Sequence, residues 1–177
     1  VTDAHSCVTT RTVTITEPAA VLATTATQIN VDCKGNSNAS VDLTATGGVA
    51  PYTFAWSTSA VTEDINSLTA GTYAVTVTDA NLCTTVRNIT ITEPAAVLAT
   101  SSTQSHVDCR GNNNGDVNLT VTGGTTPYVY AWSNGETTQD VSSLVAGVYI
   151  VTVTDAHLCT ATRSATITQP AAALLAT

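Results

Sequence analysis

The chain has 177 residues, of which 13 are acidic and 5 are basic, giving a formal net charge of −8 at pH 7. So few cationic side chains exclude a nucleic-acid binder, because neutralising phosphates requires clustered Lys and Arg. Hydrophobic residues make up 43% of the chain, which is enough for a folded core, and no apolar stretch is long enough to cross a bilayer. Thr and Val dominate the composition. These β-branched residues favour strands, so we expect an all-β fold.

The sequence repeats itself with a constant 76-residue period, without an insertion or deletion. Cys33, Trp56, Cys83 and Pro94 recur in this way as Cys109, Trp132, Cys159 and Pro170. The start of the chain keeps the same register, since Cys7 and Pro18 stand one period before Cys83 and Pro94. A period of this length predicts an array of structural repeats.

The register also predicts that the chain is a segment of a longer array, and it predicts where the repeats begin and end. We expect residues 1–18 to be the C-terminal hairpin of a preceding repeat, residues 19–94 and 95–170 to be two complete Ig-like repeats, and residues 171–177 to begin a following repeat.

Within one repeat, alternation of apolar and polar residues marks the strands. In chain order, a weakly marked strand at residues 28–33 would turn Ile29 and Val31 inward. Clearer strands follow around residues 41–46, 52–56, 72–78 and 89–91, separated by turns such as Gly47-Gly48 and Asp79-Ala80. Short strands at this spacing predict a tandem array of Ig-like antiparallel β-sandwiches. The expected core includes Trp56, Trp132, Tyr73 and Tyr149.

The five cysteines allow two pairings that respect the repeat. Bonds within the units would be Cys33–Cys83 and Cys109–Cys159, with Cys7 bonded to an upstream repeat; bonds between the units would be Cys7–Cys33 and Cys83–Cys109. Strand counting favours the first scheme. We count an even number of strand reversals between the end of the first strand and the start of the last, and we expect both points at the same pole of the sandwich. Paired cysteines indicate an oxidising, extracellular setting.

An ordered series of short motifs resembles the SprB repeat of gliding-bacterial cell-surface adhesins. The series is Cys109-Arg-Gly, Thr122-Gly-Gly-Thr-Thr-Pro-Tyr, Tyr130-Ala-Trp-Ser-Asn-Gly, Leu144-Val-Ala-Gly-Val-Tyr, Val153-Thr-Asp-Ala-His-Leu-Cys and Ile167-Thr-Gln-Pro. The resemblance covers both complete repeats and the terminal fragments. It implies a very long, secreted surface protein, exported by the type IX system and often moved along the cell during gliding motility.

No group of residues forms a recognisable catalytic motif, so we expect a protein that is not an enzyme. His5 and His157 share a repeat position with Asn81, and the only paired carboxylates, Glu63-Asp64, become Gln139-Asp140 in the second repeat. We therefore assign no catalytic residue.

One loop offers oxygen ligands that could suit calcium. Asp108, Asn112, Asn114 and Asp116 follow one another with Gly111 and Gly115 between them. A simpler interpretation is an Asn- and Gly-rich turn whose side chains bond their own backbone. We therefore expect no required cofactor, with Ca²⁺ kept as an alternative.

These patterns predict a structural and adhesive repeat that forms a disulfide-clipped rod or stalk on the cell surface. The expected partners are neighbouring repeats of the same chain or filament, and surface polysaccharide. A first alternative is a subunit of a self-assembling extracellular filament, in which an edge strand completes the sheet of a neighbour. A second alternative is a carbohydrate-binding module, which the solvent-facing Thr rows could support.

Overall fold

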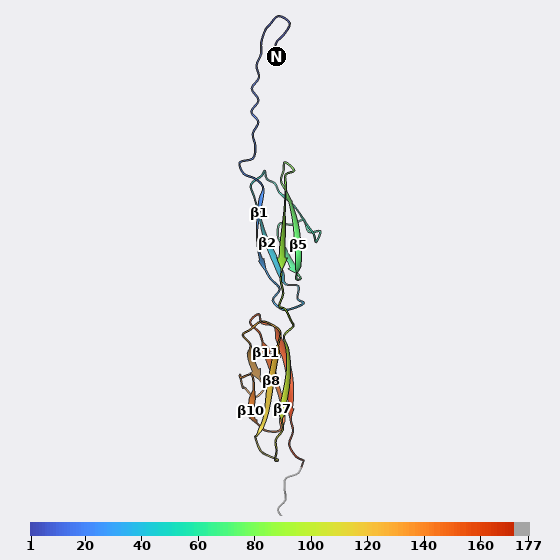
Figure 1. Cartoon of the computed structure of the whole chain (residues 1–177), viewed down its shortest axis with the longest axis vertical. Helices are drawn as coiled ribbons and strands as arrows, with labels where there is room; N and C mark the ends of the chain where they lie inside the picture. The colour runs from blue at the N-terminus through green and yellow to red at the C-terminus, as the bar shows by residue number, and fades with distance from the viewer. Residues whose placement is uncertain (172–177) are drawn as a thin grey trace, which may run out of the picture.

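In the computed structural model of the chain, residues 1–171 are described, and they contain twelve β-strands and no helix. Two β-sandwiches follow one another along a single long axis, and the N-terminal segment extends from the free end of the first (Figure 1). No helix able to span a membrane occurs among these residues. Of the predicted opening of a following repeat, only Ala171 belongs to the described part of the chain.

The twelve strands divide evenly between the two sandwiches. The first contains β1 (Ala23–Ile29), β2 (Ala39–Thr46), β3 (Thr53–Trp56), β4 (Ile65–Leu68), β5 (Gly71–Thr78) and β6 (Thr84–Ile91). The second contains β7 (Ala99–Ser105), β8 (Gly115–Thr122), β9 (Val129–Trp132), β10 (Val141–Leu144), β11 (Gly147–Thr154) and β12 (Thr160–Ile167). Equivalent strands have the same length and almost the same pattern of burial, as expected from the repeat in the sequence.

Each sandwich consists of two antiparallel, three-stranded sheets. In the first sandwich the strand orders are β1-β2-β4 and β3-β5-β6, and the second has the equivalent orders. The hairpin of β5 and β6 is the longest continuous pairing of the first sandwich, running from Gly71 opposite Ile91 to Thr78 opposite Thr84. Because side chains alternate along a strand, Val75, Val77 and Ile91 turn inward and are almost fully buried.

The strand order and two aromatic residues identify this sandwich as Ig-like. Taking β1 to β6 as strands A, B, C, E, F and G gives sheets ABE and CFG, an immunoglobulin arrangement without strand D. Trp56 on β3 is buried at the sheet interface, and its Nε1 donates a hydrogen bond to the Thr62 carbonyl at 2.9 Å. Tyr73, near the start of β5, is half-buried and donates through Oη to the Thr69 carbonyl at 2.9 Å, as in a tyrosine corner.

The second sandwich repeats both aromatic features. Trp132 is buried and donates to the Thr138 carbonyl at 2.9 Å, and the Tyr149 Oη donates to the Val145 carbonyl at 3.0 Å. The two tryptophans therefore lie in the cores, and the two tyrosines pack against the cores with their hydroxyl groups bonded at the edge.

Two details of the first sheet differ from the pattern-based expectation. Strand β1 begins earlier than predicted and ends at Ile29, whose side chain is 67% exposed, so the inward orientation predicted for Ile29 is wrong. Val31 is buried as predicted, but it lies in the loop after β1. The loop is held against the chain just after β6, because the Val31 N–H donates to the Thr92 carbonyl at 3.0 Å.

Residues 1–9 form a small isolated hairpin rather than part of a sheet. Thr2 and Val8 form a β-bridge, and the Asp3 N–H donates to the Cys7 carbonyl at 3.1 Å. The Asp3 carboxylate accepts hydrogen bonds from the N–H groups of His5 and Cys7, both at 2.9 Å. The same turn occurs at Asp79 and at Asp155, one and two periods later.

Candidate functional site: the junction between the sandwiches

The linker between the two sandwiches is bonded to both of them along almost its whole length. On the first sandwich, the Thr92 N–H donates to Asn30 Oδ1 at 3.0 Å. On the second, the Gly124 N–H donates to the Ala96 carbonyl at 3.0 Å. A methyl group on Gly123, whose φ is +69°, would collide with the carbonyl of Val97, so this glycine allows the linker to approach closely. Only Pro94 and Ala95 lie between the two anchored parts.

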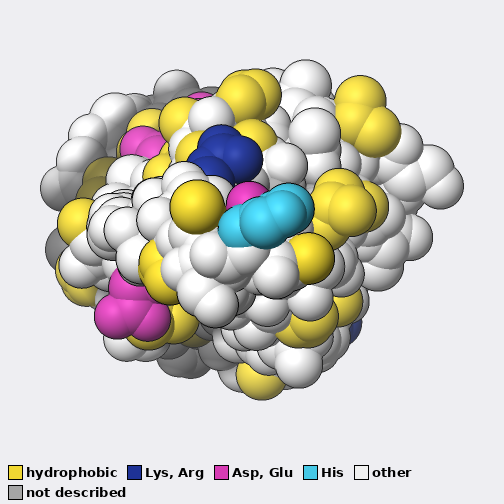
Figure 2. Space-filling model, turned by 90° about the horizontal axis from the view of Figure 1, so that it is seen from above, with side chains coloured by type: hydrophobic (Ala, Val, Ile, Leu, Met, Phe, Trp, Pro, Cys, Tyr) yellow, Lys and Arg dark blue, Asp and Glu magenta, His cyan; other side chains and the backbone are white. Residues whose placement is uncertain are grey.

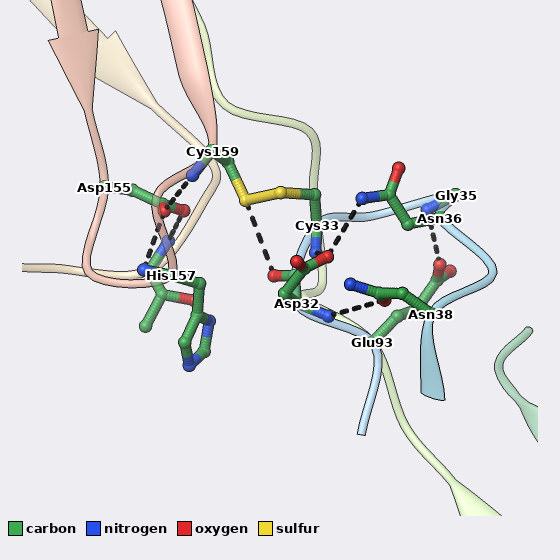
Figure 3. Close-up of a disulfide and its surroundings, with 10 residues drawn as sticks. Asp32, Cys33, Gly35, Asn36, Asn38, Glu93, Asp155, His157 and Cys159 are labelled. Carbon is green, nitrogen blue, oxygen red and sulfur yellow. Dashed lines mark hydrogen bonds between the residues drawn. A yellow bond between two sulfur atoms is a disulfide. The ribbon is translucent and has the colours of Figure 1, made fainter. Parts of the chain in front are cut away.

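A disulfide bond between Cys33 and Cys159 crosses the junction beside this linker (Figure 3). Cys33 lies in the loop between β1 and β2 of the first sandwich, and Cys159 lies in the turn between β11 and β12 of the second. Their Cα atoms are 5.7 Å apart, which is an ordinary disulfide separation. The Cys159 Sγ also lies 3.5 Å from the Asp32 carbonyl oxygen. The two sandwiches therefore have two covalent connections.

This bond contradicts both predicted pairings. Cys33–Cys83 and Cys109–Cys159 do not form, and the remaining cysteines, Cys7, Cys83 and Cys109, are exposed thiols. The two pairings considered were those within one repeat and those between the last cysteine of one repeat and the first of the next. The observed bond joins the first cysteine of one repeat to the last cysteine of the next, which respects the repeat equally well.

The direction of the strands explains why the bond within a repeat is absent. The chain reverses four times between β1 and β6, so these two strands run in the same direction. They also lie side by side, since Arg87 Nη1 donates to the Thr24 carbonyl and Gln28 Nε2 donates to the Thr90 carbonyl, both at 3.0 Å. The end of β1 and the start of β6 are therefore at opposite ends of the sandwich. The predicted even number of strand reversals is correct. It places Cys33 and Cys83 at opposite ends of the sandwich, however, so the prediction that they lie at the same pole is wrong.

The loop that carries Cys33 is fixed by its own polar side chains. Asp32 Oδ1 accepts hydrogen bonds from the Cys33 N–H and from Asn36 Nδ2, the latter at 2.9 Å. The Asp32 N–H in turn donates to Asn38 Oδ1 at 3.4 Å. The hydrogen bond from Asn36 is the main reason that the pKa of Asp32 lies below its usual range. These contacts hold the backbone on both sides of Cys33 in place.

The same loop is also attached to the linker by charge. Glu93 accepts a hydrogen bond from Lys34 Nζ at 2.8 Å. It accepts a second one from the Gly35 N–H at 2.7 Å (Figure 3). The bond from Lys34 is the largest cause of the lowered pKa of Glu93. Both side chains are partly exposed, so water screens the attraction and this pair contributes little stability. Its effect is to hold the Cys33 loop against the linker.

The turn that carries Cys159 is organised by one buried carboxylate, Asp155, which is 3% exposed. Burial alone would raise the pKa of Asp155. The carboxylate, however, accepts three backbone hydrogen bonds, from Thr125 at 2.8 Å and from His157 and Cys159 at 2.9 Å. These bonds outweigh burial and hold its pKa below the ordinary value. Asp79 is bonded in the same way to Val49, Asn81 and Cys83, and its pKa is also lowered.

We therefore expect acid to destabilise these turns. A carboxylate whose pKa is lower in the folded state stabilises the fold above its unfolded pKa of about 3.9, and this stabilisation disappears as the pH falls through the folded value. The double variant Asp79→Asn and Asp155→Asn should be less stable than the wild type at pH 7. Its Tm should fall less steeply than that of the wild type between about pH 4 and pH 2. Circular-dichroism melts across this range provide the measurement.

The control for this experiment is Asp42→Asn, which removes an exposed carboxylate from β2. This variant should follow the wild-type pH profile. Parallel pH profiles for the double variant and the wild type would contradict the assigned role of Asp79 and Asp155.

Two hollows flank the junction. A cavity of about 160 Å³ is lined by Cys33, Lys34 and Asn36 from the first sandwich and by Leu98, Gly124 and Cys159 from the second. The larger hollow, of about 460 Å³, includes Asn30, Asp32, Glu93, Thr125 and His157. The Asp32 and Glu93 carboxylates are engaged in the loop described above. Both carboxylates therefore help to hold the Cys33 loop at the junction.

The four residues considered for calcium are used within their own loop. Asp108 Oδ1 accepts a hydrogen bond from Asn112 Nδ2 at 2.9 Å, and Asn114 Oδ1 accepts from the Asp108 N–H at 3.4 Å. Asp116 is on β8, and its Oδ1 accepts from the Ser105 N–H of β7 at 3.1 Å. Among residues 1–171, no group of three or more His, Cys, Asp or Glu side chains is arranged to hold a metal ion. Hydrogen bonds thus account for the shape of this loop.

Comparison with known proteins identifies a repeat and adds little else. No curated protein matches the chain. Among solved structures, an amphioxus IgVJ-C2 molecule is 13% identical, with 81% of this chain and 96% of that one aligned and a TM-score of 0.34. Murine CEACAM1b is 15% identical, with coverage of 76% and 94% and a TM-score of 0.32. These scores are low, so the Ig-like assignment rests on the strand order and aromatic residues of the chain itself.

The SprB repeat matches residues 25–61 and 101–137, which are equivalent positions of two successive periods. Each matched segment runs from the first strand of a sandwich, through the loop with Cys33 or Cys109, to the turn after the tryptophan strand. The resemblance noted from the motifs is thereby confirmed. The chain thus contains two copies of the SprB repeat.

Proposed function

We propose that the chain is a non-enzymatic stalk module of a long extracellular adhesin, in which successive repeats are held in line by covalent bonds. The observation that carries this proposal is the Cys33–Cys159 disulfide beside the linker. A single flexible linker would allow one sandwich to swing about the other. A second covalent connection at the same junction removes most of that freedom, because both attachments would have to move together.

The sequence and the surface are consistent with an extracellular structural protein. Disulfides persist in oxidising compartments and are rare in the cytosol. Charged residues are only 10% of the chain, and the view along the long axis shows few charged side chains (Figure 2). The SprB repeat favours a cell-surface adhesin, and a role in gliding motility follows only from that likeness. We further propose residues 19–94 and 95–170 as the repeating units.

The edges of the sheets argue against the filament alternative. Assembly by strand addition needs a long exposed edge with unpaired backbone groups. In the first sandwich, β1 and β6 lie beside each other, and the other two edge strands, β3 and β4, have four residues each. Such short edges offer few backbone hydrogen bonds to an incoming strand. The proposed partners are therefore neighbouring repeats joined end to end.

The aromatic residues also give little support to a carbohydrate-binding module. Sugar binding commonly uses exposed aromatic faces, but Trp56 and Trp132 are buried. Tyr52 and Tyr128 donate their hydroxyl hydrogens to the carbonyls of Gly47 and Gly123 and are only partly exposed. Contact with surface polysaccharide would thus depend on the Thr-rich sheet faces.

Small-angle X-ray scattering tests the stalk proposal directly. The oxidised chain should scatter as one extended body whose two sandwiches keep a fixed mutual orientation. The double variant Cys33→Ser and Cys159→Ser should need an ensemble of bent arrangements and should have a smaller mean radius of gyration. The matched control, Cys83→Ser and Cys109→Ser, retains the junction bond and should scatter like the wild type. Identical curves for all three proteins would show that the disulfide does not align the sandwiches.

A further inference from the structure

We propose that Cys83 and Cys109 each form a further junction disulfide with a cysteine of another repeat. Each repeat of an array would then be bonded to both of its neighbours. The partner at each site would be another SprB repeat of the same polypeptide. This inference rests on the proposed stalk function and extends it from one junction to a continuous series. Two observations support it: the bond already formed by the equivalent cysteines, and the ready-made surface at each open end.

The repeat register relates each exposed thiol to a bonded one. Cys109 stands one period after Cys33, and Cys83 stands one period before Cys159. Cys33 and Cys159 are bonded to each other, whereas Cys83 and Cys109 are exposed at opposite ends of the two-sandwich unit. The structure thus contains one complete junction disulfide and, for each of two further junctions, one of the two cysteines.

The loop with Cys109 keeps most of the internal hydrogen bonds of the loop with Cys33, although no disulfide holds it. The Asn112 N–H donates to the Cys109 carbonyl at 3.1 Å, and the Asn36 N–H donates to the Cys33 carbonyl at 3.0 Å. The Gly111 N–H donates to Gln169 Oε1 at 3.0 Å, in the position where Gly35 bonds Glu93. The loop is therefore formed before any partner arrives, and little conformational freedom remains to be lost when it bonds.

The turn with Cys83, at the opposite end, has the same internal bonds as the turn with Cys159. Cys83 lies in the Asp79 turn, which makes the same three backbone bonds as the Asp155 turn at Cys159. The Gly48 N–H donates to the Ala20 carbonyl at 2.8 Å, just as Gly124 bonds Ala96. The segment before β1 is thus fixed on the first sandwich as the linker is fixed on the second.

A groove at this end has most of its lining positions in common with the cavity at the complete junction. Its lining residues are Glu17, Pro18, Ala20, Val21, Leu22, Gly48, Asp79, Cys83 and Thr84. All of them except Glu17 and Asp79 have an equivalent residue, one period later, that lines the cavity at the complete junction. The groove has a volume of about 270 Å³, and the cavity at the complete junction has a volume of about 160 Å³. The difference agrees with an open groove that lacks the cysteine loop of a preceding repeat.

Formation of each bond is an ordinary thiol–disulfide exchange with a small-molecule disulfide such as oxidised glutathione. One cysteine thiolate attacks the oxidant, forming a mixed disulfide and releasing one glutathione thiolate. The second cysteine thiolate attacks the protein sulfur of that mixed disulfide and releases the other glutathione. The two cysteines are oxidised by two electrons, the oxidant is reduced to two thiols, and the two protons of the cysteines end on those thiols.

A three-repeat chain tests the proposal. It is made by copying residues 101–176 once more after residue 176, and it is oxidised with a glutathione buffer. The full two-repeat chain, treated in the same way, should keep Cys83 and Cys109 reactive toward a maleimide while Cys33 and Cys159 are protected. In the three-repeat chain, Cys109 should become protected, and peptide mapping without reductant should find it bonded to the copy of Cys159. Cys83 and the copied Cys109 should remain reactive.

The controls separate this inference from the stalk proposal. Replacing the copy of Cys159 by Ser should restore the reactivity of Cys109 and leave Cys33–Cys159 intact. If Cys33–Cys159 forms but Cys109 stays reactive in the three-repeat chain, the continuous series is wrong and the single junction stands. If Cys33–Cys159 does not form in either chain, the stalk proposal itself fails. A bond between Cys109 and Cys159 in the three-repeat chain would also overturn the inference.

Discussion

Pulling the oxidised chain by its two ends should release about 40–45 nm less length on complete unfolding than pulling the reduced chain. Cys33 and Cys159 are 126 positions apart in sequence, and an extended chain gains about 3.4 Å per residue. The disulfide keeps their Cα atoms 5.7 Å apart even when both sandwiches have unfolded. All of β2 to β11 lies inside this covalent loop and cannot be extended by the force.

Single-molecule force spectroscopy with handles at the two termini measures this difference. Oxidised chains should lengthen only through the residues outside the loop, chiefly the N-terminal segment, β1 and β12. Adding reductant should restore the missing length. The Cys83→Ser and Cys109→Ser variant should behave like the oxidised wild type, because its junction bond is unchanged. Equal released lengths with and without reductant would show that the bond is absent from the protein in solution.

Loss of the junction disulfide should also lower the free energy of unfolding substantially. In the chain-entropy account, closing a loop of this length stabilises the folded state by about 5 kcal/mol, because the unfolded chain is restricted. Small sandwiches bury limited cores, so this contribution is large in comparison with their total stability. The double variant Cys33→Ser and Cys159→Ser should therefore melt at least about 10 °C below the oxidised wild type.

Thermal melts followed by circular dichroism check this result, with the wild type in reductant as a second measurement of the same loss. The reduced wild type and the double variant should melt together. The Cys83→Ser and Cys109→Ser variant should keep the melting temperature of the oxidised protein, since it removes only exposed thiols. A shift of similar size in that control would assign the loss to the substitutions rather than to the bond.

The strands with regular alternation could be predicted from the sequence, whereas β1 was misplaced and β4 was missed. The residues of β2, β3, β5 and β6 alternate regularly, and all four strands were expected. Strand β4, Ile65–Leu68, was missed because its two buried residues are three positions apart. A register shift against β2 and the positive φ of Ser67, 57°, place both side chains on the same face. Ser143 at 59° repeats this irregularity in β10.

The cysteine pairing needed information that the repeat alone does not contain. The period limits the pairings to those that recur along an array, but several of them satisfy this condition. The choice depends on which end of the sandwich carries each cysteine, and hence on the direction of β1 relative to β6. The signal was available in the predicted strand order, because an even number of reversals makes two strands parallel. Cys33 and Cys83 then lie at opposite ends, and a partner in the next repeat becomes the natural one.

The bond between Cys33 and Cys159 also has a consequence for a protein exposed to extracellular proteases. A cut in any loop between these two cysteines, such as the one between β3 and β4 or between β9 and β10, would leave both fragments attached through sulfur. A nicked stalk would therefore still join its two ends. Such a chain would lose its continuity only when it was cut outside the loop or when the bond itself was reduced.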